Sequence, residues 1–272
     1  MILGSILNNI IVIMQLMKIS ILGITGKMGN KIAELITSSN DMQLVGGTTS
    51  SNNVLKGQEL YGITVDTDLT SAFQNADVLI DFSSPIILPQ HLEYATRHKK
   101  PLLIGTTGLN VNHDNLLKIS AKTVPILQAS NTSIGITLLC NLVKVAAQKL
   151  DLSYDVEILE THHREKIDAP SGTALELGKA VATGRKIDLK HVKSFNRRGV
   201  RKQGEIGFSS LRGGGIFGEH TIRFLGDDEV IEFSHVSLNR RLFAKGALCA
   251  ARWLATQKQG LYTMQDVLNY DI

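Results

Sequence analysis

The stretch from Glu160 to Ala174 contains the densest group of side chains that can move protons. It reads Glu-Thr-His-His-Arg-Glu-Lys-Ile-Asp-Ala-Pro-Ser-Gly-Thr-Ala, so that His162, His163 and Lys166 lie close together. A histidine titrates near neutral pH, and a lysine can donate a proton or pair with an anion. The stretch therefore indicates acid–base chemistry on a polar, negatively charged substrate. From spacing alone, an exposed charged turn without a ligand is the alternative.

The second half of this stretch is typical of the start of a helix. Pro170 and Ser171 suit the first helical turn, whose backbone N–H groups have no partner inside the helix. We therefore expect the amides of Gly172 and Thr173 to be free to bind a carboxylate.

A metal site is a rival interpretation of the same residues. His162, His163 and Glu165 could act as ligands, with His220 or His235 completing the set. The sequence contains no HExxH or other familiar zinc spacing. We therefore expect acid–base work and no metal.

A glycine-rich segment directly follows the first strand-like run of the chain. Its residues are Gly23, Ile24, Thr25, Gly26, Lys27, Met28 and Gly29. Glycines at a strand–helix turn let the backbone approach a pyrophosphate, and the helix N-terminus attracts its charge. The spacing is GxxGxxG, not the commoner GxGxxG, but its position on the first strand–helix turn predicts dinucleotide binding. A structural turn without a ligand is the alternative.

The end of the second strand bears on the choice between NAD and NADP. An acidic residue often binds the adenine ribose at this point, but here the strand runs into Thr49 and Ser50. Hydroxyl groups can bond either a ribose or a 2′-phosphate, and Lys27 could pair with that phosphate. The sequence leaves the choice between NADH and NADPH open.

Two further polar segments follow predicted parallel strands. They are Gly105-Thr106-Thr107-Gly108 and Ala129-Ser130-Asn131-Thr132. Ligands of such sheets bind beyond the carboxyl ends of the strands. Together with the glycine segment, these residues define one edge of one crevice.

The elements that must position these residues differ between the two halves of the chain. Strand-like runs at 19–24, 43–49, 77–82, 102–105 and 124–127 alternate with helical patterns as far as Asn131. This alternation predicts an α/β fold with a doubly wound parallel sheet. After one long helix ending near Leu150, runs at 155–161, 205–211, 221–225 and 229–236 predict a mostly antiparallel or mixed sheet. A last helix, 242–257, is expected to end before Gly260, a C-cap candidate.

Composition restricts the class of protein. The chain has 272 residues, 43% of them hydrophobic and 20% charged, which is typical of a folded protein and not of a disordered one. Its net charge of +4 is spread along the sequence. The densest basic stretch, Arg197 to Lys202, has no aromatic platform beside it, so we expect a solvated loop and no nucleic-acid partner.

Cysteine usage and the N-terminal segment bear on location. Cys140 and Cys249 lack CxxC spacing, which fits a reducing cytoplasm. Residues 1–16 are apolar but lack the basic start of a signal peptide and the length of a membrane span. We expect them to form an extension outside the fold. A short membrane-associating helix is the alternative.

From Met17 onward, the chain resembles the dihydrodipicolinate reductase family. The segment Glu160–Ala174 is similar to the signature of that family. Supporting matches are Gly23–Gly29, Asp81–Pro85, Gly105–Gly108, Ala129–Gly135 and Gly218–Thr221. The resemblance implies NADH- or NADPH-dependent reduction of the cyclic imine diacid formed from 4-hydroxy-tetrahydrodipicolinate, in lysine and diaminopimelate biosynthesis. Thr49 and Ser50 depart from the Glu-Arg pair of better-known members, which leaves the cofactor preference in doubt.

The resemblance also implies roles and an organisation. His162 would be the acid/base residue and Lys166 a proton donor, while His163, Gly172, Thr173 and, more weakly, Arg240 would hold the substrate carboxylates. The cofactor would lie along Gly23–Met28, Gly105–Thr107 and Ala129–Thr132. Residues 17–131 and 241–272 would form a Rossmann-type dinucleotide-binding domain. Residues 132–240 would form a substrate-binding domain, whose open mixed sheet builds a homotetramer.

Two other functions are compatible with the glycine segment. A different oxidoreductase of similar build, such as an aspartate or sugar dehydrogenase, would share the glycine segment. A non-catalytic NAD(P)-sensing regulator would share it too. Neither needs His162, His163 and Lys166 together, so this trio favours the reductase.

Overall fold

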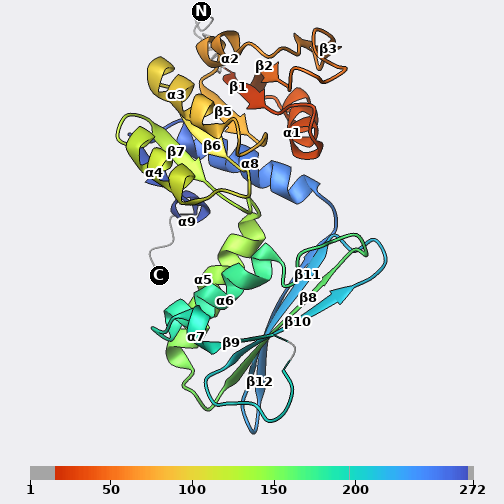
Figure 1. Cartoon of the computed structure of the whole chain (residues 1–272), viewed down its shortest axis with the longest axis vertical. Helices are drawn as coiled ribbons and strands as arrows, with labels where there is room; N and C mark the ends of the chain where they lie inside the picture. Colours follow the sequence, from red (N-terminus) through yellow and green to blue (C-terminus); the bar gives the residue numbers. More distant parts are fainter. Residues whose placement is uncertain (1–15, 196, 269–272) are drawn as a thin grey trace, which may run out of the picture.

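The computed structural model describes residues 16–195 and 197–268. Residues 1–15 of the expected N-terminal extension lie outside these described residues. The described chain forms two bodies, one above the other in Figure 1. The N-terminal body contains a six-stranded sheet and the central body a five-stranded sheet.

The sheet of the N-terminal body is parallel throughout, with the order β13-β7-β6-β5-β1-β2. Its strands are β1 (Met17–Leu22), β2 (Met42–Thr48), β5 (Val78–Asp81), β6 (Leu102–Ile104), β7 (Pro125–Gln128) and β13 (Gly260–Tyr262). The order reverses between β1 and β5, and ligands of open α/β sheets bind outside the carboxyl ends of strands at such a switch point.

Helices cover both faces of this sheet, because strand residues alternate between two hydrophobic cores. Ile19 and Ile21 of β1 join one core with α1 and α8, whereas Leu22 joins the other with α2, α3 and α4. The helices are α1 (Lys27–Thr37), α2 (Leu69–Asn75), α3 (Leu88–His98), α4 (Val111–Ser120), α8 (Arg241–Leu254) and α9 (Met264–Val267). The doubly wound parallel sheet expected from the sequence is confirmed.

Strand β13 corrects the expectation for the end of the chain. Gly260 does not cap the last long helix, because α8 ends at Leu254 with Ala255 at its C-cap. Gly260 instead opens β13 and pairs with Pro125 of β7. A strand of three residues is too short to give an alternating pattern, so its signal was lost beside the glycine.

The central body contains a mixed sheet with the order β12-β11-β8-β10-β9. Its strands are β8 (Asp155–His162), β9 (Lys193–Phe195), β10 (Ile206–Arg212), β11 (Gly218–Leu225) and β12 (Val230–Ser237). Strand β10 pairs in parallel with β8 and β9, whereas β11 runs antiparallel to β8 and β12. The predicted mixed sheet is confirmed.

Helices cover one face of the central sheet. They are α5 (Ile134–Lys149), α6 (Gly172–Gly184) and the short α7 (Leu189–Val192), and they lie on one side of the sheet in Figure 1. Val156, Ile158, Phe208, Ile222 and Phe224 pack beneath α5 and α6.

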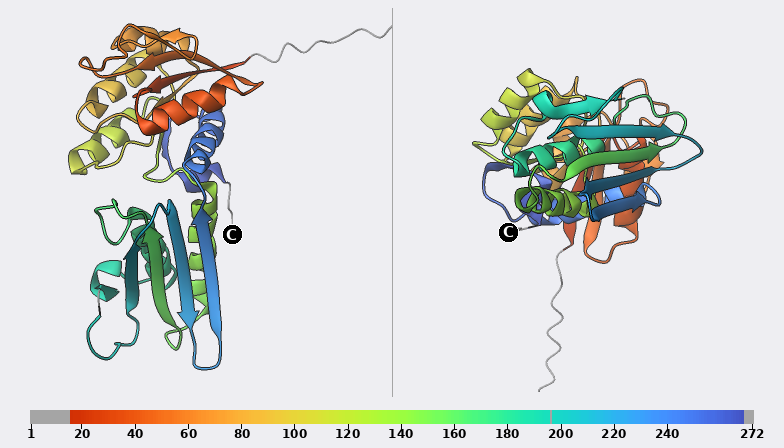
Figure 2. Two further views of the ribbon diagram at one scale, coloured as in Figure 1. Left: turned by 90° about the vertical axis from the view of Figure 1, so that its right-hand side faces the viewer. Right: turned by 90° about the horizontal axis from the view of Figure 1, so that it is seen from below.

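The other face of this sheet carries exposed apolar side chains. Leu159, Leu211, Val230 and Val236 are exposed on neighbouring strands. The pairing register places them on the face opposite α5 and α6. In the left view of Figure 2 this sheet faces the viewer and its helices lie behind it.

Strands β3 (Glu59–Leu60) and β4 (Ile63–Thr64) form a small separate hairpin. In the basic stretch, Arg197 and Arg201 pair with Glu157 of β8, so this loop is attached to the sheet as well as solvated. Within residues 16–195 and 197–268, no helix has the length and apolar character needed to cross a membrane.

Candidate active site

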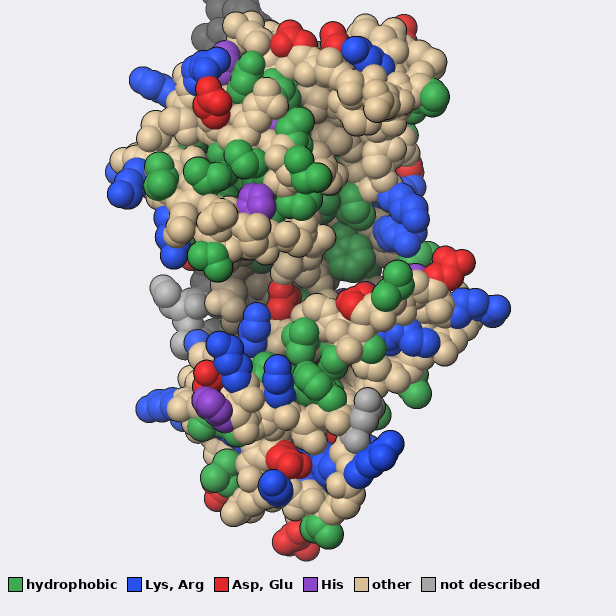
Figure 3. Space-filling model, viewed as in Figure 1, with side chains coloured by type: hydrophobic (Ala, Val, Ile, Leu, Met, Phe, Trp, Pro, Cys, Tyr) green, Lys and Arg blue, Asp and Glu red, His purple; other side chains and the backbone are tan. Residues whose placement is uncertain are grey.

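A cavity of about 670 Å³ lies between the two bodies, where the surface in Figure 3 is hollowed. The N-terminal body contributes loop residues at the carboxyl ends of its strands, and the central body contributes the end of β8 and the start of α6. Of the predicted site residues, the lining includes Met28, Gly105, Thr107, Ala129, Ser130, Asn131, Thr132, His162, His163, Lys166, Gly172, Thr173 and Arg240. The predicted cofactor residues and the predicted substrate residues, which are distant in sequence, therefore line the same cavity.

The glycine segment forms a tight turn between β1 and α1. Gly23 has a φ of 85°, and a Cβ on it would lie 2.8 Å from the carbonyl oxygen of Phe82. A Cβ on Gly29 would lie 2.3 Å from the carbonyl oxygen of Gly23. Glycine at both positions lets α1 sit close to β1. No side chain caps α1, whose first-turn amides can receive a pyrophosphate, so this turn fits a dinucleotide.

The rest of the glycine segment divides between the protein interior and a neighbouring cavity. Ile24 is fully buried, so its side chain belongs to the core and only its backbone can face a cofactor. Thr25, Gly26 and Lys27 line a second cavity of about 610 Å³, together with Arg240 and Arg241. Arg240 also lines the cavity between the bodies, so the two spaces adjoin.

Thr49 lies beside the glycine segment. Its hydroxyl oxygen is 2.7 Å from that of Thr25, and the Asn53 side-chain amide donates to Thr25 at 3.2 Å. The hydroxyl and amide groups gathered here can bond ribose hydroxyls. Ser50, the next residue, is exposed.

Thr106 occupies a different place from its neighbours. It is buried, and its hydroxyl donates to a carboxylate oxygen of Asp81 at 3.1 Å. Asp81 also accepts from the backbone N–H and hydroxyl of Ser83 and contacts His91 Nδ1 at 2.7 Å. The Thr106 side chain therefore holds the loops after β5 and β6 together and does not line the cavity.

Hydrogen bonds connect the loop after β7 to both bodies. The side-chain amide of Asn131 donates to the hydroxyl of Thr173 at 2.9 Å, and the hydroxyl of Ser130 donates to Glu176 of α6. Thr132 donates to the carbonyl of Phe243 at 2.8 Å, just past the start of α8. This loop thus links the predicted cofactor residues directly to the predicted substrate residues.

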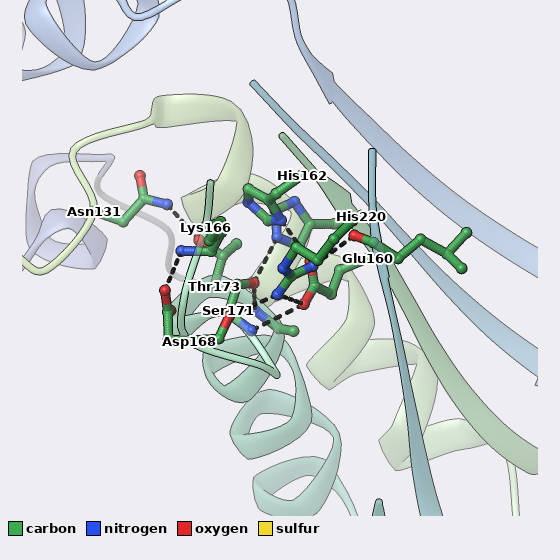
Figure 4. A network of polar contacts seen from close by, with 11 residues as sticks. Asn131, Glu160, His162, Lys166, Asp168, Ser171, Thr173 and His220 are labelled. Atoms are coloured by element: carbon green, nitrogen blue, oxygen red, sulfur yellow. Dashed lines mark hydrogen bonds and ion pairs between the residues drawn. The ribbon is translucent and has the colours of Figure 1, made fainter. Parts of the chain in front are cut away.

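His162 ends β8 with its ring in a buried polar network (Figure 4). Its Nδ1 bonds to the buried carboxylate of Glu160. Burial opposes ionisation of Glu160, but hydrogen bonds from His162 and Arg212 outweigh it and hold the pKa of this carboxyl well below its usual range. The histidine therefore faces an ionised partner.

Lys166 lies in the turn that follows β8. Its ammonium donates to Asp168 at 2.7 Å, and its side chain is 20% exposed. Burial opposes ionisation of Asp168, but the ammonium of Lys166 prevails and lowers the pKa of the carboxyl. His162 at the end of β8 and Lys166 in the turn that follows thus both line the cavity, each with an acidic partner.

Helix α6 begins at Gly172, so Pro170 and Ser171 precede its first turn instead of lying in it, while the amides of Gly172 and Thr173 open the helix as expected. Ser171 is the N-cap, and its hydroxyl accepts from the backbone N–H of Ala174 at 3.2 Å. A Cβ on Gly172 would meet nothing within 4 Å, so the space above the first amides is open. Ser171 also bonds to Nε2 of His220 at 3.1 Å. These amides can receive a carboxylate.

The metal interpretation finds no support in this geometry. The rings of His162 and His220 meet edge to face, with their centroids 5.1 Å apart. Burial, with the neighbouring charge of His162, lowers the pKa of His220 to about 4. Across residues 16–195 and 197–268, no three His, Cys, Asp or Glu side chains are grouped as a metal site requires.

Sequence reasoning missed several residues that shape the cavity. Phe82, Phe217 and Phe243 line it, and the guanidinium carbon of Arg240 lies 5.6 Å from the ring centre of Phe217. Asp168, Ser171 and Glu176 line it as well. Glu160 does not line the cavity but bonds to His162 and Ser171, which do, and Arg212 bonds to Glu160. Two motifs singled out in the sequence, Asp81–Pro85 and Glu160–Ala174, contain Phe82 and Glu160, but a motif does not show which way a side chain points.

Comparisons with known proteins agree with this arrangement. The family model described as dihydrodipicolinate reductase, N-terminus, matches residues 17–132, and that described as its C-terminus matches residues 135–268. The 4-hydroxy-tetrahydrodipicolinate reductase of Anaplasma marginale (strain St. Maries) is 42% identical over 259 residues, covering 93% of this chain and 99% of that protein. The protein of the same name from Zymomonas mobilis subsp. mobilis is 45% identical over 254 residues, covering 92% and 96%.

Solved structures show the same fold. A dipicolinate-bound dihydrodipicolinate reductase from Paenisporosarcina sp. TG-14 superposes with a TM-score of 0.77 at 24% identity, covering 93% of this chain and 99% of that one. A probable dehydrogenase from Thermotoga maritima gives a TM-score of 0.63 at 12% identity, covering 92% of each chain. The named sequence relatives are reductases, and none of these findings favours a non-catalytic regulator. With both domain models matched and relatives above 40% identity over nearly their full length, the chain belongs to the dihydrodipicolinate reductase family.

Proposed function

We propose that this protein reduces the cyclic imine diacid derived from 4-hydroxy-tetrahydrodipicolinate to tetrahydrodipicolinate, as its family relatives are named for doing. The observation that carries this proposal is the cavity between the two bodies. One wall offers a dinucleotide-binding turn, and the other offers His162, Lys166 and the open N-terminus of α6. A bound NADH or NADPH would supply the hydride at this cavity.

The substrate carboxylates would be held by the central body. The amides of Gly172 and Thr173 and the side chain of His163 line one side of the cavity, and Arg240 lines another. An anion at a helix N-terminus is stabilised by free N–H groups and by the helix dipole. Two carboxylates on a small ring would thereby be fixed with the imine between them.

The proton would come from the turn after β8. Addition of a hydride to a conjugated imine pushes electrons away from the attacked carbon, so a positive group near the imine nitrogen stabilises the transition state. Lys166 can hydrogen-bond this nitrogen, and His162 can supply or relay the proton.

The cofactor would lie along the loops of the N-terminal body. Gly23–Met28 would receive the pyrophosphate, while Gly105–Thr107 and Ala129–Thr132 would border the nicotinamide end. Within these segments, Ile24 and Thr106 would act through their backbone, because their side chains are buried. Residues 17–131 and 241–272 would form this domain, and residues 132–240 the substrate domain.

A homotetramer in the cytoplasm completes the proposal. Leu159, Leu211, Val230 and Val236 give the uncovered face of the central sheet an apolar character that a second copy of the chain can bury. The two cysteines are free, which is compatible with a reducing compartment.

The test is a coupled assay with freshly made substrate, following the oxidation of NADH and of NADPH in separate reactions. We expect turnover with both cofactors. Dissociation constants for NADH and NADPH, measured without substrate, show whether the protein is correctly folded and binds a dinucleotide. Tight cofactor binding without turnover on either cofactor would contradict the proposed reaction.

A further inference from the structure

Glu160 is a buried carboxylate beside His162, the proposed acid/base residue. It is 2% exposed and precedes His162 by two residues on β8, so both side chains point to the same face of the sheet. Burying a charge is costly unless it is paired and hydrogen-bonded. A buried carboxylate at this place therefore needs several donors.

The structure supplies four donors to the two oxygens of Glu160. Arg212 of β10 makes a two-pronged contact, with Nη1 at 2.8 Å from Oε2 and Nη2 at 2.7 Å from Oε1. His162 Nδ1 bonds to Oε2, and the backbone N–H of Ser171 donates to Oε1 at 3.1 Å. The carboxylate is thus fully engaged by two side chains and one backbone amide (Figure 4).

The contact with Glu160 determines which ring nitrogen of neutral His162 carries the proton. A carboxylate accepts but does not donate, so the contact requires the proton of the neutral ring to lie on Nδ1. The other nitrogen, Nε2, lies next to Gly218, where a Cβ would come within 3.0 Å of it. Gly218 therefore leaves room for a ring whose Nε2 is available for proton transfer.

Arg212 also balances the negative charge of Glu160. Arg212 shares Glu160 with His162, so the carboxylate keeps a counter-charge when the histidine gives up its second proton. A histidine paired with a lone buried carboxylate would leave that carboxylate unbalanced on becoming neutral. Because Arg212 stays paired with Glu160, His162 can change between its charged and neutral forms without leaving the buried carboxylate unpaired.

Glu160 also contacts the start of α6. Oε1 of Glu160 holds the N–H of Ser171, the N-cap residue, and Arg212 Nη2 donates to the carbonyl of Asp168 at 2.6 Å. The carboxylate therefore fixes both the histidine and the helix whose first amides face the cavity. One buried pair connects the proton-transfer side of the site to its carboxylate-binding side.

We propose that Glu160 and Arg212 are positioning residues for the reductase reaction. They set the tautomer of His162 and fix the position of its ring relative to the start of α6. This inference rests on the proposed function. Neither residue lines the cavity, so both act through His162 and Ser171 and neither contacts the substrate.

The test compares Glu160→Gln with Glu157→Gln. Both carboxylates lie on β8 and pair with arginine, but Glu157 points to the opposite face and binds Arg197 and Arg201. An amide at position 160 can donate to Nδ1 and so favour the wrong tautomer. We expect kcat of Glu160→Gln to fall by roughly 10²-fold or more, since a positioned acid or base contributes about 10²–10⁴-fold and this one would lose its orienting carboxylate. The NADH dissociation constant should stay within about twofold, and Glu157→Gln should match the parent protein in both values.

Nitrogen NMR of histidine-labelled protein gives a readout that does not depend on turnover. The His162 signal is assigned by its loss in His162→Asn. We expect the parent protein to show a proton on Nδ1 whenever the ring is neutral, and Glu160→Gln to show a different or mixed tautomer. An unchanged His162 spectrum with normal kcat in Glu160→Gln would overturn the proposal, as would an equal loss of kcat in Glu157→Gln.

A double variant separates positioning from simple stabilisation. Glu160→Gln combined with Arg212→Met removes the unpaired charge that either single change leaves behind, so part of the lost stability should return. We expect kcat to stay as low as in Glu160→Gln. Recovery of kcat together with stability would show that the pair only holds the fold. If Glu160→Gln does not fold, Arg212→Lys keeps the charge without the two-pronged contact and is tested by the same spectrum. Absence of turnover in the parent protein would count against the proposed function, while the tautomer measurement would still test this inference.

Discussion

We expect cofactor choice to depend most directly on Thr49. Thr49 directly follows β2, and its hydroxyl oxygen lies 2.7 Å from that of Thr25 in the glycine segment. With no carboxylate at this position to repel a 2′-phosphate and no arginine to bind it, we expect both cofactors to be used within about a hundredfold in kcat/KM, a gap under about 3 kcal/mol.

A substitution at Thr49 tests this expectation. Thr49→Glu adds a ribose partner and a charge that repels the 2′-phosphate, so the ratio of kcat/KM values should move toward NADH. Thr64→Glu, at an exposed threonine of β4, is the control and should leave the ratio unchanged. A shift toward NADPH in Thr49→Glu would show that Thr49 does not lie at the adenine ribose.

His220 should make folding stability depend on pH. Burial, then the charge of His162, lowers its pKa to about 4 from an unfolded value near 6.5. Between these values the unfolded chain binds more protons than the folded one, so stability is highest above pH 6.5 and is lost as pH falls toward 4. The loss is on the order of 3 kcal/mol.

Urea unfolding at several pH values between 4 and 7 measures this effect. His220→Gln should flatten the dependence of the unfolding free energy on pH, whereas His191→Gln, at an exposed histidine, should not. Equal slopes in the parent protein and His220→Gln would rule out His220 as the source.

At the scale of elements, Gly246 determines how closely α8 approaches the loop after β7. A Cβ at this position would lie 1.7 Å from the carbonyl oxygen of Thr132, a backbone atom that cannot simply move aside. Glycine to alanine within a helix usually stabilises by up to about 1 kcal/mol. Here we expect Gly246→Ala to destabilise by about 2 kcal/mol or more, as overpacking does. Thermal and urea unfolding check this, with Lys245→Ala as a control of near-zero effect.

Hydrophobic periodicity predicts the long elements of this chain but not the shortest ones. The long runs of β8 and α5 were predicted to within about one residue, because each alternates or repeats over seven residues or more, whereas the run predicted at 19–24 is displaced by two residues from β1. The short strands β9 and β13, with three residues each, were not predicted. Their pairing is decided by neighbours distant in sequence, which a local pattern does not contain.

The same limit applies within the candidate site. Spacing brought His162, Lys166 and the start of α6 together correctly, because they lie in one stretch of chain. It did not reveal that Thr106 turns inward to Asp81, nor that Arg212 comes from β10 to bind Glu160. Side-chain direction and long-range ion pairs follow from packing and remain hidden in the sequence.

At the scale of the whole molecule, the uncovered face of the central sheet predicts assembly. Leu211, near the end of β10 on this face, is 62% exposed. Placing a charge there should oppose burial against another copy, so Leu211→Glu should lower the mass measured by light scattering from that of a tetramer. Ile119→Glu, at an exposed apolar residue of α4, should leave the mass unchanged. A tetramer that persists in Leu211→Glu would place the interface elsewhere.

In the proposed reaction, the turn after β8 supplies the proton while the loops of the N-terminal body bind the cofactor. The most direct measurement is kcat of Lys166→Ala beside its dissociation constant for NADH, with Lys190→Ala of α7 as the control. Removing a positioned proton donor typically costs about 10²–10⁴-fold, so we predict a kcat lower by that order and a dissociation constant within about twofold of the parent value. Near-normal turnover, or loss of NADH binding with chemistry intact, would contradict this assignment.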